Sequence, residues 1–176
     1  MKRLFAVLLA CVMILAFTGC MDDASSGSVS SDPSADSSLA GADDLRSRDG
    51  VMLIISSTIE GPIDYYNEDR LTGITYTIDW DGTITKTSNY LTSGDVDDGM
   101  AELSSEDYMT VYEFAEDAYN NDTYRGYFEN DVMDGSTYGF TYYPADSSEG
   151  VQIFGGYCYS NDSLNGIIKL AESYFR

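Results

Sequence analysis

The sequence from Gly50 to Arg176 predicts one α+β domain, an antiparallel sheet of about five strands with two amphipathic helices on one face. Two observations predict this class. Segments in which apolar and polar residues alternate occur in two pairs, and an amphipathic helical pattern follows each pair. The order is therefore one strand and then two strand–strand–helix units. A segment of this length is the size of a single domain with its own core.

The first three strands are predicted at the start of this segment. Residues 51–56 are nearly all apolar, which is typical of a buried strand. From residue 71 the apolar residues recur with the period of two of a half-buried strand: Ile74, Tyr76, Ile78 and Trp80. Asp81-Gly82 then predicts a tight hairpin turn, and the return strand runs from Thr83 to about Leu91.

A loop and a helix complete the first unit. The loop is expected where the sequence carries Asp95, Asp97 and Asp98. Ser104 is a good helix N-cap, and Asp107 lies at the position of a capping-box acid. The apolar face of the helix follows a three–four spacing: Tyr108, Val111, Tyr112, Ala115, Ala118 and Tyr119.

The second unit repeats this order. Tyr138, Phe140 and Tyr142 alternate on one strand, and residues 144–150 form a turn. The return strand is expected to carry Val151, Ile153, Tyr157 and Tyr159, with Gly155-Gly156 marking a bulge or a close backbone approach. A last helix begins near Asp162, and its apolar face repeats the spacing of the first helix: Leu164, Ile167, Ile168, Ala171, Tyr174 and Phe175. Duplication of one unit is a hypothesis that this spacing leaves open.

The N-terminus carries an export pattern. Lys2 and Arg3 precede an uncharged apolar run, residues 4–17, which is the length of a secretory signal and short for a membrane span. The run ends in Phe17-Thr18-Gly19-Cys20, which resembles a bacterial lipobox, although that family more often has Leu at the position of Phe17. An ordinary cleaved signal and an uncleaved anchor are the alternatives.

The resemblance implies that residues 1–19 are removed and that Cys20 carries the lipid. Two acyl chains, palmitate or similar, contribute about 0.8 kcal/mol per buried CH2 and hold a protein on a membrane. The expected location is the extracytoplasmic face of the cell membrane. Cys11 leaves with the signal, so Cys158 is the other mature cysteine and no intramolecular disulfide is expected.

Residues 20–49 are predicted to be a disordered tether. Ser, Asp, Ala and Gly dominate this segment, which cannot bury enough apolar surface to offset its chain entropy. As a flexible spacer it would reach roughly 30 Å. A docking motif within the tether is the alternative.

The charge of the chain excludes some partners. The whole sequence has a net charge of −21, and residues 50–176 hold 23 acidic residues against five basic ones. Nucleic acid is excluded, because its phosphates need Lys and Arg, and so is direct binding to anionic lipid. Solubility is the simplest explanation of the acids; cation binding or a basic partner is the alternative.

The residue types present exclude most catalytic chemistry. The chain has no histidine, which removes Ser-His-Asp, Cys-His and His-ligated zinc sites. No phosphate-binding or dinucleotide-binding glycine motif is present, so no cofactor, metal or enzyme activity is expected. Carboxylate pairs remain a minor route to a hydrolase. The segment 79–83 resembles part of an EF-hand loop, but Thr77 and Ser88 stand where acids are needed, so calcium stays an alternative.

Binding is the function that remains. Most of the tyrosines lie at inward positions and are expected in the core, with Tyr65, Tyr66 and Tyr143 the candidates for exposure. Cys158 is expected to be buried, and the polar side of the first hairpin is expected to face water or a partner: Thr75, Thr77, Thr85 and Thr87. The sequence favours a non-enzymatic lipoprotein that binds a protein or an envelope component. A module for a small ligand, glycan or calcium, and an inhibitor of a secreted enzyme are the alternatives.

Overall fold

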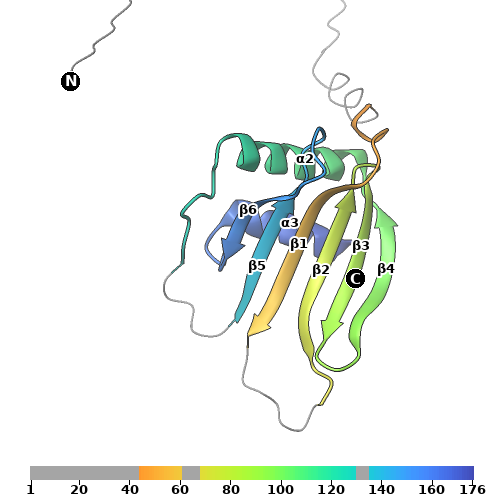
Figure 1. Cartoon of the computed structure of the whole chain (residues 1–176), viewed down its shortest axis with the longest axis vertical. Coiled ribbons are helices and arrows are strands. Elements are labelled where there is room, and N and C mark those ends of the chain that lie inside the picture. Colours follow the sequence, from red (N-terminus) through yellow and green to blue (C-terminus); the bar gives the residue numbers. More distant parts are fainter. Residues whose placement is uncertain (1–43, 61–67, 130–134) are drawn as a thin grey trace, which may run out of the picture. The chain divides into compact units, whose positions relative to one another are not determined.

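The computed structural model describes residues 44–60, 68–129 and 135–176. In this part of the chain the elements follow one another as β1 (Val51–Glu60), β2 (Leu71–Asp79), β3 (Thr83–Tyr90), β4 (Gly94–Glu102), α2 (Ser105–Asn120), β5 (Gly135–Tyr142), β6 (Val151–Gly156) and α3 (Asp162–Ser173) (Figure 1). The strands form one six-stranded antiparallel sheet in the order β4-β3-β2-β1-β5-β6. The α+β class is confirmed. None of the described helices is long and apolar enough to cross a membrane.

The sheet has one strand more than predicted, because the segment expected to be an acidic loop is β4. Acidic residues are depleted in strands, since strands are usually half buried. β4 avoids the free-energy cost of burying charge because it is an edge strand, and its Asp side chains are exposed. Gly94 and Gly99 supply positive φ angles of 77° and 120°. The first unit is therefore three strands and a helix, so the two predicted units do not match.

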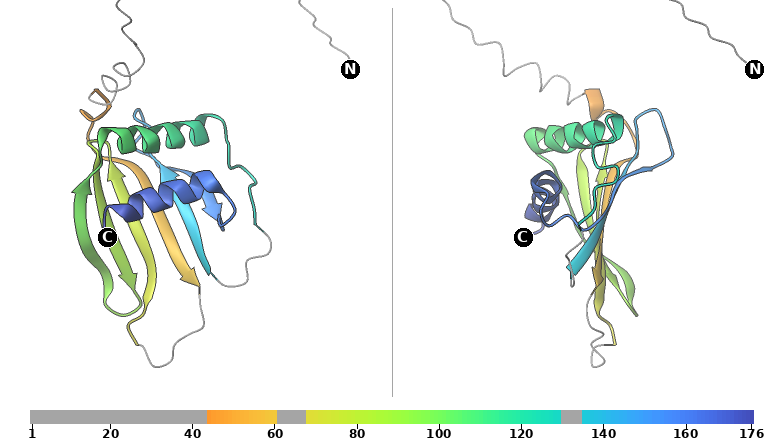
Figure 2. Two further views of the ribbon diagram at one scale, coloured as in Figure 1. Left: turned by 180° about the vertical axis from the view of Figure 1, so that it is seen from behind. Right: turned by 90° about the vertical axis from the view of Figure 1, so that its left-hand side faces the viewer.

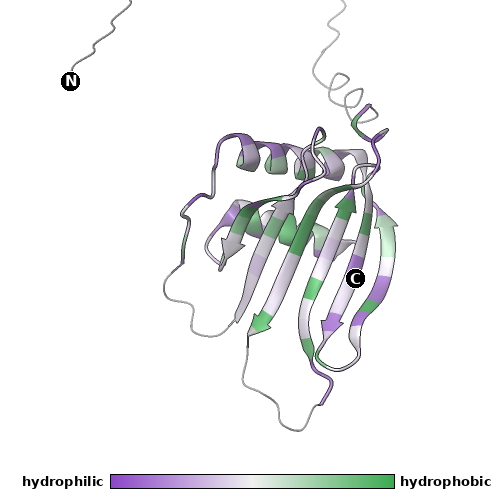
Figure 3. Ribbon diagram, viewed as in Figure 1, coloured by the Kyte–Doolittle hydropathy of each residue, from purple (hydrophilic) through white to green (hydrophobic). Residues whose placement is uncertain are grey.

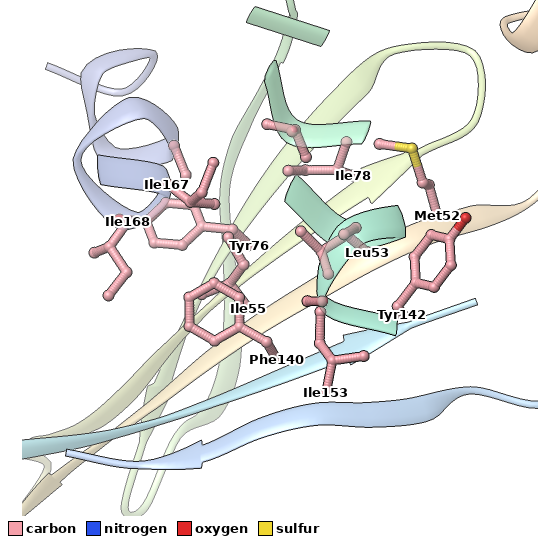
Figure 4. Close-up of a cluster of buried hydrophobic side chains, with 14 of the residues drawn as sticks. Met52, Leu53, Ile55, Tyr76, Ile78, Phe140, Tyr142, Ile153, Ile167 and Ile168 are labelled. Carbon is pink, nitrogen blue, oxygen red and sulfur yellow. The ribbon is translucent and has the colours of Figure 1, made fainter. Parts of the chain in front are cut away.

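β1 lies at the centre of the sheet and carries a long hydrophobic stretch (Figure 3). Ile55 pairs with Tyr76 of β2 on one side and with Phe140 of β5 on the other, so these three side chains share one face. Tyr76 packs against Phe175, just beyond α3, with ring centroids 5.9 Å apart. Phe140 packs against Phe114 of α2 at 5.7 Å. This one row of the sheet, whose members Tyr76, Ile55 and Phe140 lie side by side in Figure 4, thus contacts α2 and the residues that follow α3.

The helix starts follow local capping rules. Ser104 caps α2 as predicted, and its hydroxyl accepts a hydrogen bond from the Asp107 amide at 3.1 Å. Asn161 caps α3 through its side-chain oxygen, which accepts from the Leu164 amide. A long-range link joins the two helices: the Tyr174 hydroxyl accepts from the Ser104 amide and donates to the Asp107 carboxylate.

β6 is shorter and less regular than predicted. It ends at Gly156, so Tyr157 and Tyr159 lie outside it, and Tyr159 is exposed. A register shift between Phe140 and Thr141 leaves Ile153 as an extra residue, and both Ile153 and Phe154 are buried. The bulge breaks the expected alternation, because an extra residue reverses which face the next side chains take. Val151 pairs with the buried Tyr142 and shares its face of the sheet, but on this edge strand it is 40% exposed.

Residues 44–49, assigned to the tether by the sequence, contact the domain. The Arg46 guanidinium donates to the Leu103 carbonyl at 2.7 Å and lies 4.8 Å from the ring centre of Tyr108. Arg48 lies 5.1 Å from the ring centre of Trp80, which is buried at the hairpin turn. Cation–π contacts of this kind hold the two arginines on the domain.

Candidate binding groove beside strand β6

An open groove runs along β6, an edge strand of the sheet. Its volume is about 540 Å³, within the range of ligand pockets. Five consecutive β6 residues line one side of the groove, and the end of α2 with the segment after it, residues 122–128, lines the other. The ribbon places this segment beside the β6 edge of the sheet (Figures 1 and 2). The lining residues are Ala118, Tyr119, Asp122, Tyr124, Arg125, Gly126, Tyr127, Phe128, Val151, Gln152, Ile153, Phe154 and Gly155. We call this space the β6 groove.

Packed aromatic rings form the inner wall of the β6 groove. Phe154 lies 6.1 Å from both Tyr124 and Tyr127 and 5.8 Å from Phe140, measured between ring centroids. Tilted and edge-on ring pairs at such distances are favourable. Burial raises the pKa of Tyr124, so its hydroxyl stays neutral. The wall is therefore a cluster of packed aromatic rings, with phenol groups among them.

Glu129 directly follows the segment that lines the groove and holds the end of that segment in place. Its carboxylate accepts from the Tyr127 hydroxyl at 2.6 Å and from the amides of Tyr159 and Ser160 at 2.9 and 2.8 Å. The Tyr127 hydrogen bond, followed by the two amides, holds the pKa of Glu129 below its usual value. A charged carboxylate thus ties the segment after α2 to the turn after β6.

The mouth of the β6 groove is exposed and apolar. Tyr119 is 39% exposed, Phe128 70% and Val151 40%. These are three of the eight large hydrophobic side chains exposed in the described part of the chain. The groove also holds an exposed ion pair, in which Arg125 meets Asp122 at 2.9 Å. The pair leaves the groove without net charge.

The four threonines of the first hairpin lie together, as predicted. Thr75 pairs with Thr87, and Thr77 with Thr85. They alternate with the buried Tyr76 and Ile78 and so occupy the opposite face of the sheet. All four are half-buried, and Tyr143 is half-buried as well. Tyr65 and Tyr66 lie outside the described residues.

The acidic segments have structural partners. At the hairpin turn, the Asp81 carboxylate accepts from the Thr83 amide at 2.8 Å. In β4, Asp98 pairs with Lys86 at 3.2 Å and accepts from the Ser88 hydroxyl. Those contacts lower the pKa of Asp98, the Ser88 hydrogen bond most. Within residues 44–60, 68–129 and 135–176, no three His, Cys, Asp or Glu side chains converge on a point where a metal could bind.

The structure describes one of the two cysteines that are expected in the mature chain. Cys158 is 1% exposed, so its predicted burial is confirmed. Burial, with a smaller contribution from Glu129, raises the pKa of its thiol to about 11. Such a thiol is unreactive, because thiolate is the nucleophile. Cys20 lies outside the described residues, and its lipidation stays a prediction.

Sequence reasoning missed the β6 groove. Two signals for it were present in the sequence. The segment Val151–Gly156 carries no charged residue, and residues 124–128 place Tyr124, Tyr127 and Phe128 within five positions. Neither pattern reveals that the two segments lie side by side, because only the sheet order makes β6 an edge.

Comparison of the chain with protein-family models, with curated proteins and with solved structures finds no match.

Proposed function

We propose that this chain is a lipoprotein on the extracytoplasmic face of the cell membrane, anchored by lipid on Cys20, and that its domain binds a protein or another envelope component without catalysing a reaction. The β6 groove is the observation that supports binding. A wall of packed aromatic rings with an exposed apolar rim is typical of recognition surfaces. The lipobox-like sequence ending in Cys20 supports the anchor.

The arrangement of the domain supports this proposal. We take both helices to cover one face of the sheet, since Tyr76 and Phe140, which flank Ile55 in one row, contact Phe175 and Phe114. The groove lies at the β6 edge of the sheet. Pre-formed surfaces bind more tightly, because less conformational entropy is lost on association.

A small-ligand function is the second candidate, with glycan as the ligand. Aromatic rings stack on the apolar faces of sugars, and the β6 groove presents Tyr119 and Phe128 at its mouth. The proposed protein partner and a glycan would use the same surface, so experiments at this surface separate them.

The anchor is tested by labelling cells with radioactive palmitate. We expect the wild-type protein to carry the label and to sediment with membranes, and Cys20→Ala to lose the label. Cys158→Ala serves as the matched control, because that thiol is buried in the domain. Label retained by Cys20→Ala would refute lipidation at that residue.

The binding surface is tested by photo-crosslinking in intact cells. A photoreactive phenylalanine analogue replaces Phe128 in the groove or, as control, Glu113 on the exposed side of α2. We expect adducts from position 128 and none from position 113. Adducts sensitive to protease indicate a protein partner, and adducts sensitive to glycosidases indicate a glycan. Equal labelling at both positions, or none, would refute the groove as the binding surface.

A further inference from the structure

The two edges of the sheet differ in their protection against strand pairing. An edge strand presents unpaired N–H and C=O groups, and charged side chains and bulges usually block further pairing there. Both edge strands contain a register shift, but β4 is also protected by charge, with Asp95, Asp97 and Asp98 exposed on it. β6 has the sequence VQIFGG and carries no charge.

The lack of charge on β6 contrasts with the composition of the chain as a whole. Charged residues make up 22% of the sequence, and the net charge is −21. A short segment with high β-propensity and no charge is a hazard for aggregation when it lies on an exposed edge. Exposed sheet edges of this kind can also bind an extended peptide, which adds a strand to the sheet.

The β6 groove follows the edge of the strand rather than one of its faces. Side chains alternate between faces along a strand, so a groove on one face touches every second residue. Here Val151, Gln152, Ile153, Phe154 and Gly155 all line the groove. A ligand in the groove therefore meets the strand's edge, with the apolar side chains of Tyr119 and Phe128 across from it.

Charge indicates which chain can occupy this edge. A second copy of this protein would bring another net charge of −21 to the same surface, and like charges disfavour association. A segment with basic flanks is instead attracted by the acidic domain. The groove itself, whose Asp122 and Arg125 neutralise each other, accepts uncharged side chains.

We infer that the β6 groove binds an extended polypeptide segment with basic flanks, which adds a further strand to the sheet beside Val151–Gly156. This inference rests on the proposed binding function and names its partner class. Backbone hydrogen bonds to β6 provide the affinity, and alternate apolar side chains contact Tyr119 and Phe128. The bulge at Ile153 interrupts the ladder, so the paired stretch is short.

The test uses the full-length protein in detergent and a fluorescent peptide, Lys-Lys-Val-Thr-Val-Thr-Val-Lys-Lys, with binding followed by anisotropy. Two variants carry the same change at the two edges. Val151→Lys adds a charge to the groove, and Val96→Lys adds it to β4; the two valines are 40% and 41% exposed. Both raise the net charge equally and neither side chain is in the core.

We expect Val151→Lys to weaken binding at least about tenfold and Val96→Lys to change it less than about twofold. A peptide of the same sequence with alternate backbone nitrogens methylated should also bind about tenfold more weakly, because it lacks the N–H donors of a strand. Equal losses from the two variants would show attraction by charge alone. Unchanged binding of the methylated peptide would show contact without strand pairing. Either result overturns the inference.

A second copy and a glycan have their own outcomes. Sedimentation that shows a dimer lost in Val151→Lys but kept in Val96→Lys would assign the edge to self-association and overturn the inference. Crosslinked adducts at position 128 that only glycosidases remove would also overturn it, while leaving the proposed binding function intact. Absence of adducts at that position, by contrast, would remove the binding function itself.

Discussion

Tyr174 links the end of α3 to the start of α2, and its hydroxyl is the group to remove. In Tyr174→Phe the Ser104 amide loses an acceptor, 2.9 Å away, and the Asp107 carboxylate loses a donor at 2.5 Å. A hydrogen bond to a charged group contributes about 1.5–3 kcal/mol. The site is partly exposed, so water replaces part of each contact, and we expect a loss near the lower limit, about 1.5 kcal/mol.

Urea unfolding followed by tryptophan fluorescence measures this loss. The sequence has one tryptophan, Trp80, which is 3% exposed and lies 6.3 Å from the ring of Tyr142. For a domain of this size, about 1.5 kcal/mol corresponds to a fall of about 6 °C in Tm. Tyr119→Phe is the control, because the Tyr119 hydroxyl has no hydrogen-bond partner in the described part of the chain, and a change within about 0.5 kcal/mol is expected.

A double-mutant cycle with Asp107→Asn completes the test. If the hydroxyl acts through Asp107, the two changes together cost less than the sum of the single changes, by at least about 0.5 kcal/mol. Additive losses, or a loss in Tyr174→Phe no larger than in Tyr119→Phe, would refute the proposed link between the two helices.

Three further predictions concern other parts of the fold. Cys158 should react with a maleimide much more slowly in the native protein than in urea, because burial raises its pKa to about 11; equal rates would contradict its burial. The pKa of Asp98 is lower in the folded protein than its ordinary value of 3.8. The ionised carboxylate therefore stabilises the fold at any pH above 3.8, and this stabilisation is lost as the pH falls through the pKa of the folded protein. The Tm difference between wild type and Asp98→Asn should be present at about pH 6 and shrink toward about pH 2. Gly82→Ala should lower the free energy of unfolding in urea more than Gly94→Ala does. Both glycines have a positive φ, but a Cβ at Gly82 would also lie 2.9 Å from the guanidinium carbon of Arg46. Equal losses would mean that only backbone strain matters.

The alternating patterns were a sound guide to most of the sheet. Tyr76 and Ile78 lie inward on β2, the Asp81-Gly82 turn joins β2 to β3, and Ser104 caps α2. These features depend on local chemistry: side-chain alternation, a positive φ at glycine, and a hydroxyl near a free amide. Each can be evaluated from residues close together in the sequence.

The errors arise where distant segments decide the structure. β4 contradicts its own composition, because the acids of Gly94–Glu102 are tolerated only at a sheet edge. In β6 the bulge at Ile153 is defined by its register with β5, which no local pattern encodes. The contacts of Arg46 with Leu103 and Tyr108 likewise join residues more than 50 positions apart.

The same dependence on sheet order explains why the candidate site escaped sequence analysis. An uncharged strand such as VQIFGG is ordinary at the centre of a sheet, where neighbours pair with both sides. β1 also has a largely apolar sequence, but it lies between β2 and β5, so both of its sides are paired within the sheet. β6 lies instead at the end of the described sheet, where it lines the groove together with Tyr119 and Phe128. The strand pairing that we infer at β6 therefore depends on comparing the two edges: acids protect β4 from pairing, and β6 carries no such charge.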